Sequence, residues 1–331
     1  MFHDKSPSLI TTPTDFFDRA SALKDKLLES RRKCGLGSSD YEETLADVLE
    51  ELYKLVGKPV IDRLRQLGIP EQSRIWWCPT SAFCFLPLHA MGPIPSDDGE
   101  KRYFLDLYIC SYTPTLSALI QSRNRDSSLR SSNRPSMLLV AQPNSLPTVE
   151  REIQVIQALD TEVTSLISEA ATPATAIDGF HHHGFVHFAC HGSLEDGKPF
   201  EAGFELHGDE RLTLLEIVRA HIPAAEFAFL SACHTAEMTE GSHVEEGLHL
   251  AAAVQYCGFR SVVGTMWAMV DEDGCDLAKN FYKVMFSNSK RDRGLPYHER
   301  SAKALQSAVK KLRKKKRMTL ERWVNFVHYG A

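Results

Sequence analysis

The sequence lacks the features that identify several large classes of protein. None of its apolar runs approaches the ~20 residues that span a bilayer. The N-terminal stretch MFHDKSPSLITTPTDFF lacks the basic-then-apolar layout of a secretory signal. No GxGxxG or GxxxxGKS/T motif follows an apolar strand, so no phosphate-binding loop is indicated. These absences predict a cytoplasmic protein with no membrane segment and no cofactor.

The sequence also has no large excess of charge of either sign. The 331 residues carry 38 basic and 43 acidic side chains, a net charge of −5, which gives no general attraction to nucleic acid or to an anionic membrane. The hydrophobic fraction of 43% is typical of a globular protein that buries a core. We therefore expect no nucleic-acid partner and no membrane partner.

Cysteine pairs with the spacing of a metal site or a redox motif do not occur. None of the 8 cysteines forms a CxxC pair, and most lie in apolar runs such as WWCPTSAFCFLP, which is typical of free thiols in a reducing compartment. Cys-His neighbours occur at 190–191 and 233–234, beside three histidines at 181–183. Neighbouring residues on a strand point to opposite faces, so they do not readily bind one ion. We expect no metal site.

Short apolar segments alternate with helical patterns over most of the chain. Apolar residues at helical spacing predict a helix over 41–67 that Pro59 interrupts or restarts. Strand-like segments follow at 74–80 and 105–115, and 121–136 is polar and without period. From residue 137 onward, strands and helices alternate. This order predicts an α/β fold with a mostly parallel sheet flanked by helices.

Two of the predicted strands end in a Cys-His pair. They are VHFACHG, residues 186–192, and AEFAFLSACHTAE, residues 225–237. Functional groups gather at the carboxyl ends of parallel strands. If the strands are neighbours, His191 can ionise the Cys233 thiol and later return the proton to a leaving amine. The backbone N–H groups of Gly192 and Cys233 can bind an oxyanion.

The spacing alone leaves a second interpretation open. Cysteine is among the most buried residue types, and a strand end can hold a cysteine or a histidine simply as core. On the same strand, Cys190 faces away from His191 and is interpreted as core. His187 shares a face with His191, and it is interpreted as a structural hydrogen-bonding residue.

Several linked motifs, in order, resemble one protein family. VHFACHG, GFELHGDERLTLLEI, FAFLSACHTAE, GLHLAAAVQYCGFRSVVGTMWAMVDEDG and the closing ERWVNFVHYGA resemble the CHAT domain, a caspase-like family of cysteine proteases related to separase. SRIWWCPTSAFCFLPLHAMGP and YFLDLYICSYTPTLSAL resemble earlier segments of that family. The resemblance covers roughly residues 40 to 331, and motifs matched in order are more specific than any one alone.

The resemblance implies a caspase-like fold in two halves. Residues 41–136 would form a degenerate companion half, residues 137–331 the catalytic half, and residues 1–40 an extension. His191 matches the catalytic histidine, Cys233 the nucleophile, and Gly192 the glycine of the oxyanion hole. The implied reaction is hydrolysis of a peptide bond in a protein or peptide substrate through a thioacyl intermediate. The alternative is a catalytically silent scaffold module.

The resemblance also bears on regulation and specificity. Many CHAT domains follow helical repeats that sense a signal. The alternatives here are a domain that works alone, a separate activating or sensor protein, and a sensor region that was removed. The polar segments 193–202 and 235–243 are predicted to border the dyad. Asp271, Glu272 and Asp273 would form an acidic rim that favours a basic residue before the cleaved bond. Acids also suit a helix start, so that alternative stays open.

The last feature is a basic run at 310–317 in AVKKLRKKKRM. Such a run is typical of a nuclear-localisation signal or of a site for an anionic partner. The pattern favours instead the solvated end of the last helix, where cations suit the helix dipole. A nuclear location is therefore an alternative to the cytoplasmic one.

Overall fold

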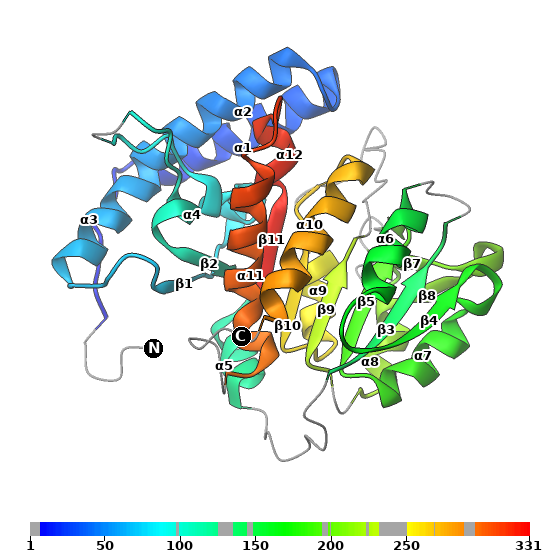
Figure 1. Cartoon of the computed structure of the whole chain (residues 1–331). Helices are drawn as coiled ribbons and strands as arrows, with labels where there is room; N and C mark the ends of the chain where they lie inside the picture. Colours follow the sequence, from blue (N-terminus) through cyan, green and yellow to red (C-terminus); the bar gives the residue numbers. More distant parts are fainter. Residues whose placement is uncertain are drawn as a thin grey trace. The chain divides into compact units, whose positions relative to one another are not determined.

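Figure 1 shows the chain as a computed structural model. It describes residues 7–96, 99–124, 135–143, 148–193, 198, 200–222, 225–231, 250–267, 269–287 and 295–331. The chain divides into two compact units, Met1–Arg74 with Thr80–Tyr108 and Ile75–Pro79 with Ile109–Ala331. The two strands from the segment 41–136 contribute to the sheet of the second unit.

The first unit is helical. It holds α1 (Phe16–Cys34), α2 (Ser39–Leu52), α3 (Lys58–Gln66) and α4 (Phe104–Leu107). A π-helical turn at Tyr53–Gly57 joins α2 to α3, and there the Lys58 N–H donates to the Tyr53 carbonyl. This wider turn accommodates Pro59, which has no N–H and would clash with a carbonyl in a regular helix. The predicted restart of the helix at Pro59 is confirmed.

An eight-stranded sheet forms the centre of the second unit, in the order β1-β2-β11-β10-β9-β5-β3-β4. Five neighbouring strands, from β4 to β10, run parallel, and β11 runs antiparallel to β10 and parallel to β2. The predicted mostly parallel sheet is confirmed. The strands are β1 (Arg74–Trp77), β2 (Ile109–Tyr112), β3 (Ser136–Ala141), β4 (Glu162–Ile167), β5 (Phe185–Ala189), β9 (Phe227–Leu230), β10 (Ser261–Thr265) and β11 (Phe326–Gly330).

Helices flank both faces of this sheet. On one face α10 (Asp271–Met285) packs between α6 (Val149–Gln157) and α11 (Tyr297–Leu312), as Figure 1 shows. Three helices contact strands on the other face, namely α5 (Leu116–Asn124), α7 (Pro173–His182) and α9 (Leu250–Tyr256). The short helix α8 (Leu214–Arg219) packs against α9. Burial on both faces explains why β5, β9 and β10 are continuous buried runs without polar alternation.

A small antiparallel sheet follows β5. It consists of β6 (Gly192–Ser193), β7 (Gly203–Glu205) and β8 (Arg211–Thr213). Gly203 allows the close approach of β8, because a Cβ atom there would overlap the backbone of Leu212 and Thr213. This sheet holds the chain immediately after β5. The short helix α12 (Leu320–Val324) leads into β11.

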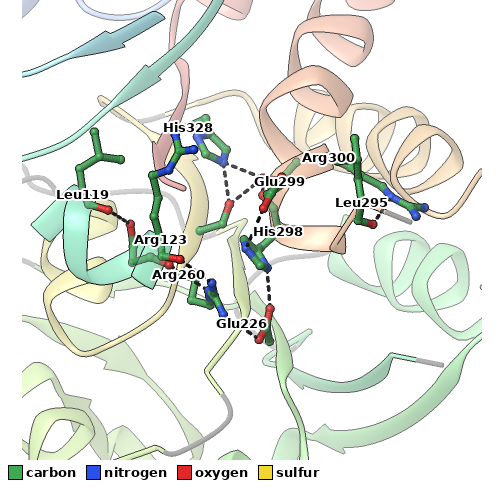
Figure 2. A network of polar contacts seen from close by, with 12 residues as sticks. Leu119, Arg123, Glu226, Arg260, Leu295, His298, Glu299, Arg300 and His328 are labelled. Atoms are coloured by element: carbon green, nitrogen blue, oxygen red, sulfur yellow. Dashed lines mark hydrogen bonds and ion pairs between the residues drawn. The ribbon is translucent and has the colours of Figure 1, made fainter. Parts of the chain in front are cut away.

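Buried polar contacts fix the amino-terminal ends of the strands, as Figure 2 shows. The Arg260 guanidinium donates from Nε to the Ser122 carbonyl at 2.9 Å, and it lies 3.6 Å from the Glu226 carboxylate. Glu226 also contacts His298 Nδ1 at 2.6 Å. Arg260 thereby ties the last turn of α5 to the starts of β9 and β10, and Glu226 ties β9 to α11.

Arg260→Ala is expected to lower the free energy of unfolding by about 3 kcal/mol, because it removes one partner of a largely buried ion pair and a donor to the end of α5. Urea denaturation followed by circular dichroism measures this. Lys311→Ala, at an exposed position on α11, is the matched control and should change stability by less than about 0.5 kcal/mol. Equal effects of the two substitutions would contradict the anchoring role of Arg260.

Candidate active site

The strands β5 and β9 are parallel neighbours in the sheet. Their register pairs His187 with Phe229 and Phe188 with Leu230. The ladder continues beyond this register, because the Ser231 N–H donates to the Phe188 carbonyl at 2.8 Å. Both strands therefore end at the same edge of the sheet. His191 follows β5 by two residues, whereas Cys233 lies outside the described residues.

Backbone pairing with β7 fixes the exit from β5. The Glu205 N–H donates to the His191 carbonyl at 2.9 Å, and Gly192 lies opposite Phe204. This pattern makes Gly192 and Phe204 a non-hydrogen-bonded pair, in which the N–H groups point away from the partner strand. The Gly192 N–H is therefore directed away from β7.

The His191 side chain is half-buried, and its Nδ1 atom is buried without a hydrogen-bond partner among the described residues. Most buried polar atoms in proteins have a partner, so an unpartnered one requires an explanation. A ring nitrogen reserved for proton transfer is one such explanation.

The residues on and directly after β5 alternate between the two faces of the sheet, as predicted. Cys190 is fully buried, and burial raises the pKa of its thiol far above the ordinary value. On the same face, Phe188 stacks on Phe204 with ring centroids 3.9 Å apart. On the opposite face, His187 Nδ1 lies 2.9 Å from the Tyr282 hydroxyl. Both interpretations are confirmed: Cys190 is core and His187 is a structural hydrogen-bonding residue.

Sequence reasoning missed Glu152, a buried carboxylate between β5 and β9. Its Oε1 lies 3.1 Å from His187 Nε2, and its Oε2 accepts a hydrogen bond from Ser231 Oγ at 2.9 Å. A signal was present in the sequence. Glu152 shares the buried helical phase of Val149, Ile153 and Ile156, where a charge is out of place.

The three acids of the predicted rim open helix α10, as the helix-start interpretation predicts. The Asp273 carboxylate is buried and accepts from Arg322 of α12 at 2.6 Å and 2.7 Å, so both of its oxygens are engaged. This pairing raises the pKa of Arg322. The Glu272 side chain is exposed, and the side chain of Asp271 lies outside the described residues. Asp273 thus joins α10 to α12, and Glu272 faces solvent.

The remaining polar clusters are accounted for by local structure. His183 is buried and bonded to the Thr164 hydroxyl at 2.8 Å, whereas His181 and His182 are exposed at the end of α7. The basic run ends α11, where Lys315 pairs with Asp276.

Within the described ranges, no group of three His, Cys, Asp or Glu side chains is placed to hold a metal ion. No helix in that part of the chain is long and apolar enough to cross a bilayer.

Burial lowers the fraction of thiolate at several other cysteines. It raises the pKa values of Cys110 and Cys257 to about 12. At pH 7 such a thiol is ionised to about one part in 10⁵, and the thiolate is the reactive form. A fast-reacting cysteine would therefore stand out clearly against these residues.

The eight-stranded, mostly parallel sheet with helices on both faces and an antiparallel β11 is an α/β fold. The chain belongs to the CHAT domain family, whose model matches residues 46–331. The resemblance noted in the sequence is thereby confirmed. Among curated protein sequences, none matches the chain.

Solved structures of low sequence identity share the fold. The Saccharomyces cerevisiae separase–securin complex at 2.6 Å matches with a TM-score of 0.51 and 13% identity, over 98% of this chain and 23% of that one. A second structure of that complex, at 3.0 Å, matches with a TM-score of 0.50 and 14% identity, over 97% and 22%. The complex of Porphyromonas gingivalis RgpB pro- and mature domains gives 0.49 and 10%, over 96% and 77%. The chain thus spans about a quarter of the separase chain.

Asp273→Ala is expected to lower the free energy of unfolding by about 3 kcal/mol, because Arg322 then loses both of its charged hydrogen bonds. Glu272→Ala, one residue away and exposed, is the matched control and should change stability by less than about 0.5 kcal/mol. Chemical denaturation of both variants measures the difference. A stable Asp273→Ala protein would show that the ion pair does not join α10 to α12.

Proposed function

We propose that this chain is a cysteine endopeptidase whose His191 and Cys233 form a catalytic dyad. The observation that carries the proposal is the parallel pairing of β5 with β9, because these strands lead to the two residues in sequence. Membership of the CHAT family and the caspase-like fold support it. The half-buried His191 ring, with an unpartnered Nδ1 within the described part of the chain, is the expected state of a base without its substrate.

In the proposed reaction, His191 accepts the thiol proton of Cys233, and the sulfur attacks the carbonyl carbon of the peptide bond. The carbonyl oxygen becomes an oxyanion, which the N–H groups of Gly192 and Cys233 stabilise. Collapse of the tetrahedral intermediate breaks the C–N bond, and the His191 imidazolium protonates the amine that leaves. Water, deprotonated by His191, then hydrolyses the thioester and restores the thiol.

The substrate preference follows from the start of α10. Glu272 and Asp271 are the acids proposed to attract a basic residue before the cleaved bond, whereas Asp273 already pairs with Arg322. A separate protein is proposed to control access to the site. One structure that shares this fold is a separase–securin complex, so that relative has a protein partner.

The dyad predicts fast labelling of Cys233 by a peptidyl electrophile at pH 7. His191→Ala should slow this labelling about 100-fold or more, because general-base catalysis contributes that much. Intact-mass spectrometry of the parent and of His191→Ala measures the rates. Cys233→Ala is the control that assigns the label to this residue.

Labelling of the parent no faster than that of an ordinary exposed thiol would contradict the proposed function. Such a result would instead favour a catalytically silent interaction module.

The acidic rim predicts a modest preference for Lys or Arg before the cleaved bond. Glu272→Gln should lower the kcat/KM ratio of basic over neutral substrates about 1.4-fold to fivefold, because an exposed ion pair contributes about 0.2–1 kcal/mol. A positional peptide library compares the two proteins. Glu299→Gln, at an exposed position on α11, serves as the charge-matched control. An unchanged ratio would show that Glu272 does not contribute to the preference for a basic residue.

A further inference from the structure

The layer of side chains beneath the end of β5 holds a buried carboxylate. Ala189 and Ser231, the residues that follow the last register pair of β5 and β9, both have small side chains. On the same face, the carboxylate of Glu152 enters from α6 and is almost completely buried. At Gly274, helix α10 lies against the Ser231 hydroxyl so closely that an added Cβ atom would overlap it. Glu152 therefore occupies a closed polar position below the strand ends.

Hydrogen bonds connect Glu152 to groups on both sides of it. His187 Nε2 lies 3.1 Å from Glu152 Oε1, and the other ring nitrogen of His187, Nδ1, lies 2.9 Å from the Tyr282 hydroxyl. The Ser231 hydroxyl donates to Glu152 Oε2. Both carboxylate oxygens of Glu152 are therefore engaged. Burial, followed by the charge of Glu152, raises the pKa of Tyr282 well above its ordinary value, which keeps this hydroxyl protonated.

Stability alone is a poor explanation for this arrangement. Removing a carboxylate from water is costly, and apolar residues that replace buried charged groups often leave a protein equally or more stable. The position of Glu152 offers a different explanation. One carboxylate oxygen contacts His187 on β5, four residues before His191. The other accepts a hydrogen bond from Ser231, which follows β9 and lies two residues before Cys233.

We propose that Glu152 is a positioning residue that holds the His191 strand end and the Ser231 strand end at a fixed separation. This inference rests on the proposed function. Glu152 bonds to neither member of the dyad within the described residues and acts through His187 and Ser231. A displacement of about 1 Å between reacting groups can slow a reaction about 100-fold, so a rigid link at this place has catalytic value.

Glu152→Gln tests the proposal with little change in shape. An amide oxygen can still accept one of the two hydrogen bonds, but the amide nitrogen cannot accept the other. We expect the rate constant for inactivation of Cys233 by the peptidyl electrophile, measured at saturation, to fall about tenfold or more. The half-saturating concentration should stay within about twofold, because the residue is buried away from substrate. Glu150→Gln, exposed on the same helix, is the matched control.

A double-mutant cycle with Ser231→Ala distinguishes positioning from loss of folding. Ser231→Ala removes only the link to β9, so it should slow inactivation as Glu152→Gln does, and the double variant should be little slower than either one. Melting temperatures should stay within a few degrees of that of the parent. If Glu152→Gln fails to fold, Ser231→Ala alone carries the test.

The outcomes separate this inference from the proposed function. A parent that reacts slowly overturns both. A fast parent with equally fast Glu152→Gln and Ser231→Ala variants overturns only the positioning role. A loss of rate that matches the loss of folded protein, or that is additive in the cycle, also overturns it.

Discussion

The parallel pairing of β5 with β9 is the constraint on which the candidate site depends. It brings two strand ends that are forty residues apart in sequence to one edge of the sheet. The small sheet β6–β8 then holds the chain after His191 and turns the Gly192 N–H away from β7. Helix α10 closes the same region through the pairing of Asp273 with Arg322. Each of these contacts is useful only because the two strands are neighbours.

Polar groups within the core are gathered at both ends of the strands, and they serve different purposes. At the amino ends, Arg260 and Glu226 connect helices to strands, in contacts that bridge distant parts of the chain (Figure 2). At the carboxyl ends, Glu152 connects one strand to the next. The long apolar middle of the sheet has no such groups on β9, where four consecutive residues are buried hydrophobes. The hydrophobic effect is non-directional and cannot fix the relative positions of the strand ends. The hydrogen bonds and ion pairs at these ends are directional and can do so.

Much of this fold could be predicted from sequence because continuous apolar runs and helical periods are local signals. The strands β3, β5, β9 and β10 and the restart at Pro59 are of this kind. The ion pair of Asp273 could not be predicted, because its partner is 49 residues away in sequence. Glu152 lies among the apolar residues of a predicted helix, so its burial could be noticed. Its role could not be predicted, because its partners lie on two strands that are distant in sequence. The position of β11 between β10 and β2 likewise has no local signal.

The place of β11 also has a consequence for biosynthesis. Residues 326–330 separate β10 from β2 in the sheet, although β2 is made more than two hundred residues earlier. During translation, β2 therefore cannot pair with β11 until residues 326–330 have been synthesised. A domain with such long-range pairing folds slowly and exposes sheet edges that can aggregate. Any peptidase activity would accordingly appear only after β11 has been synthesised and has paired with β10 and β2.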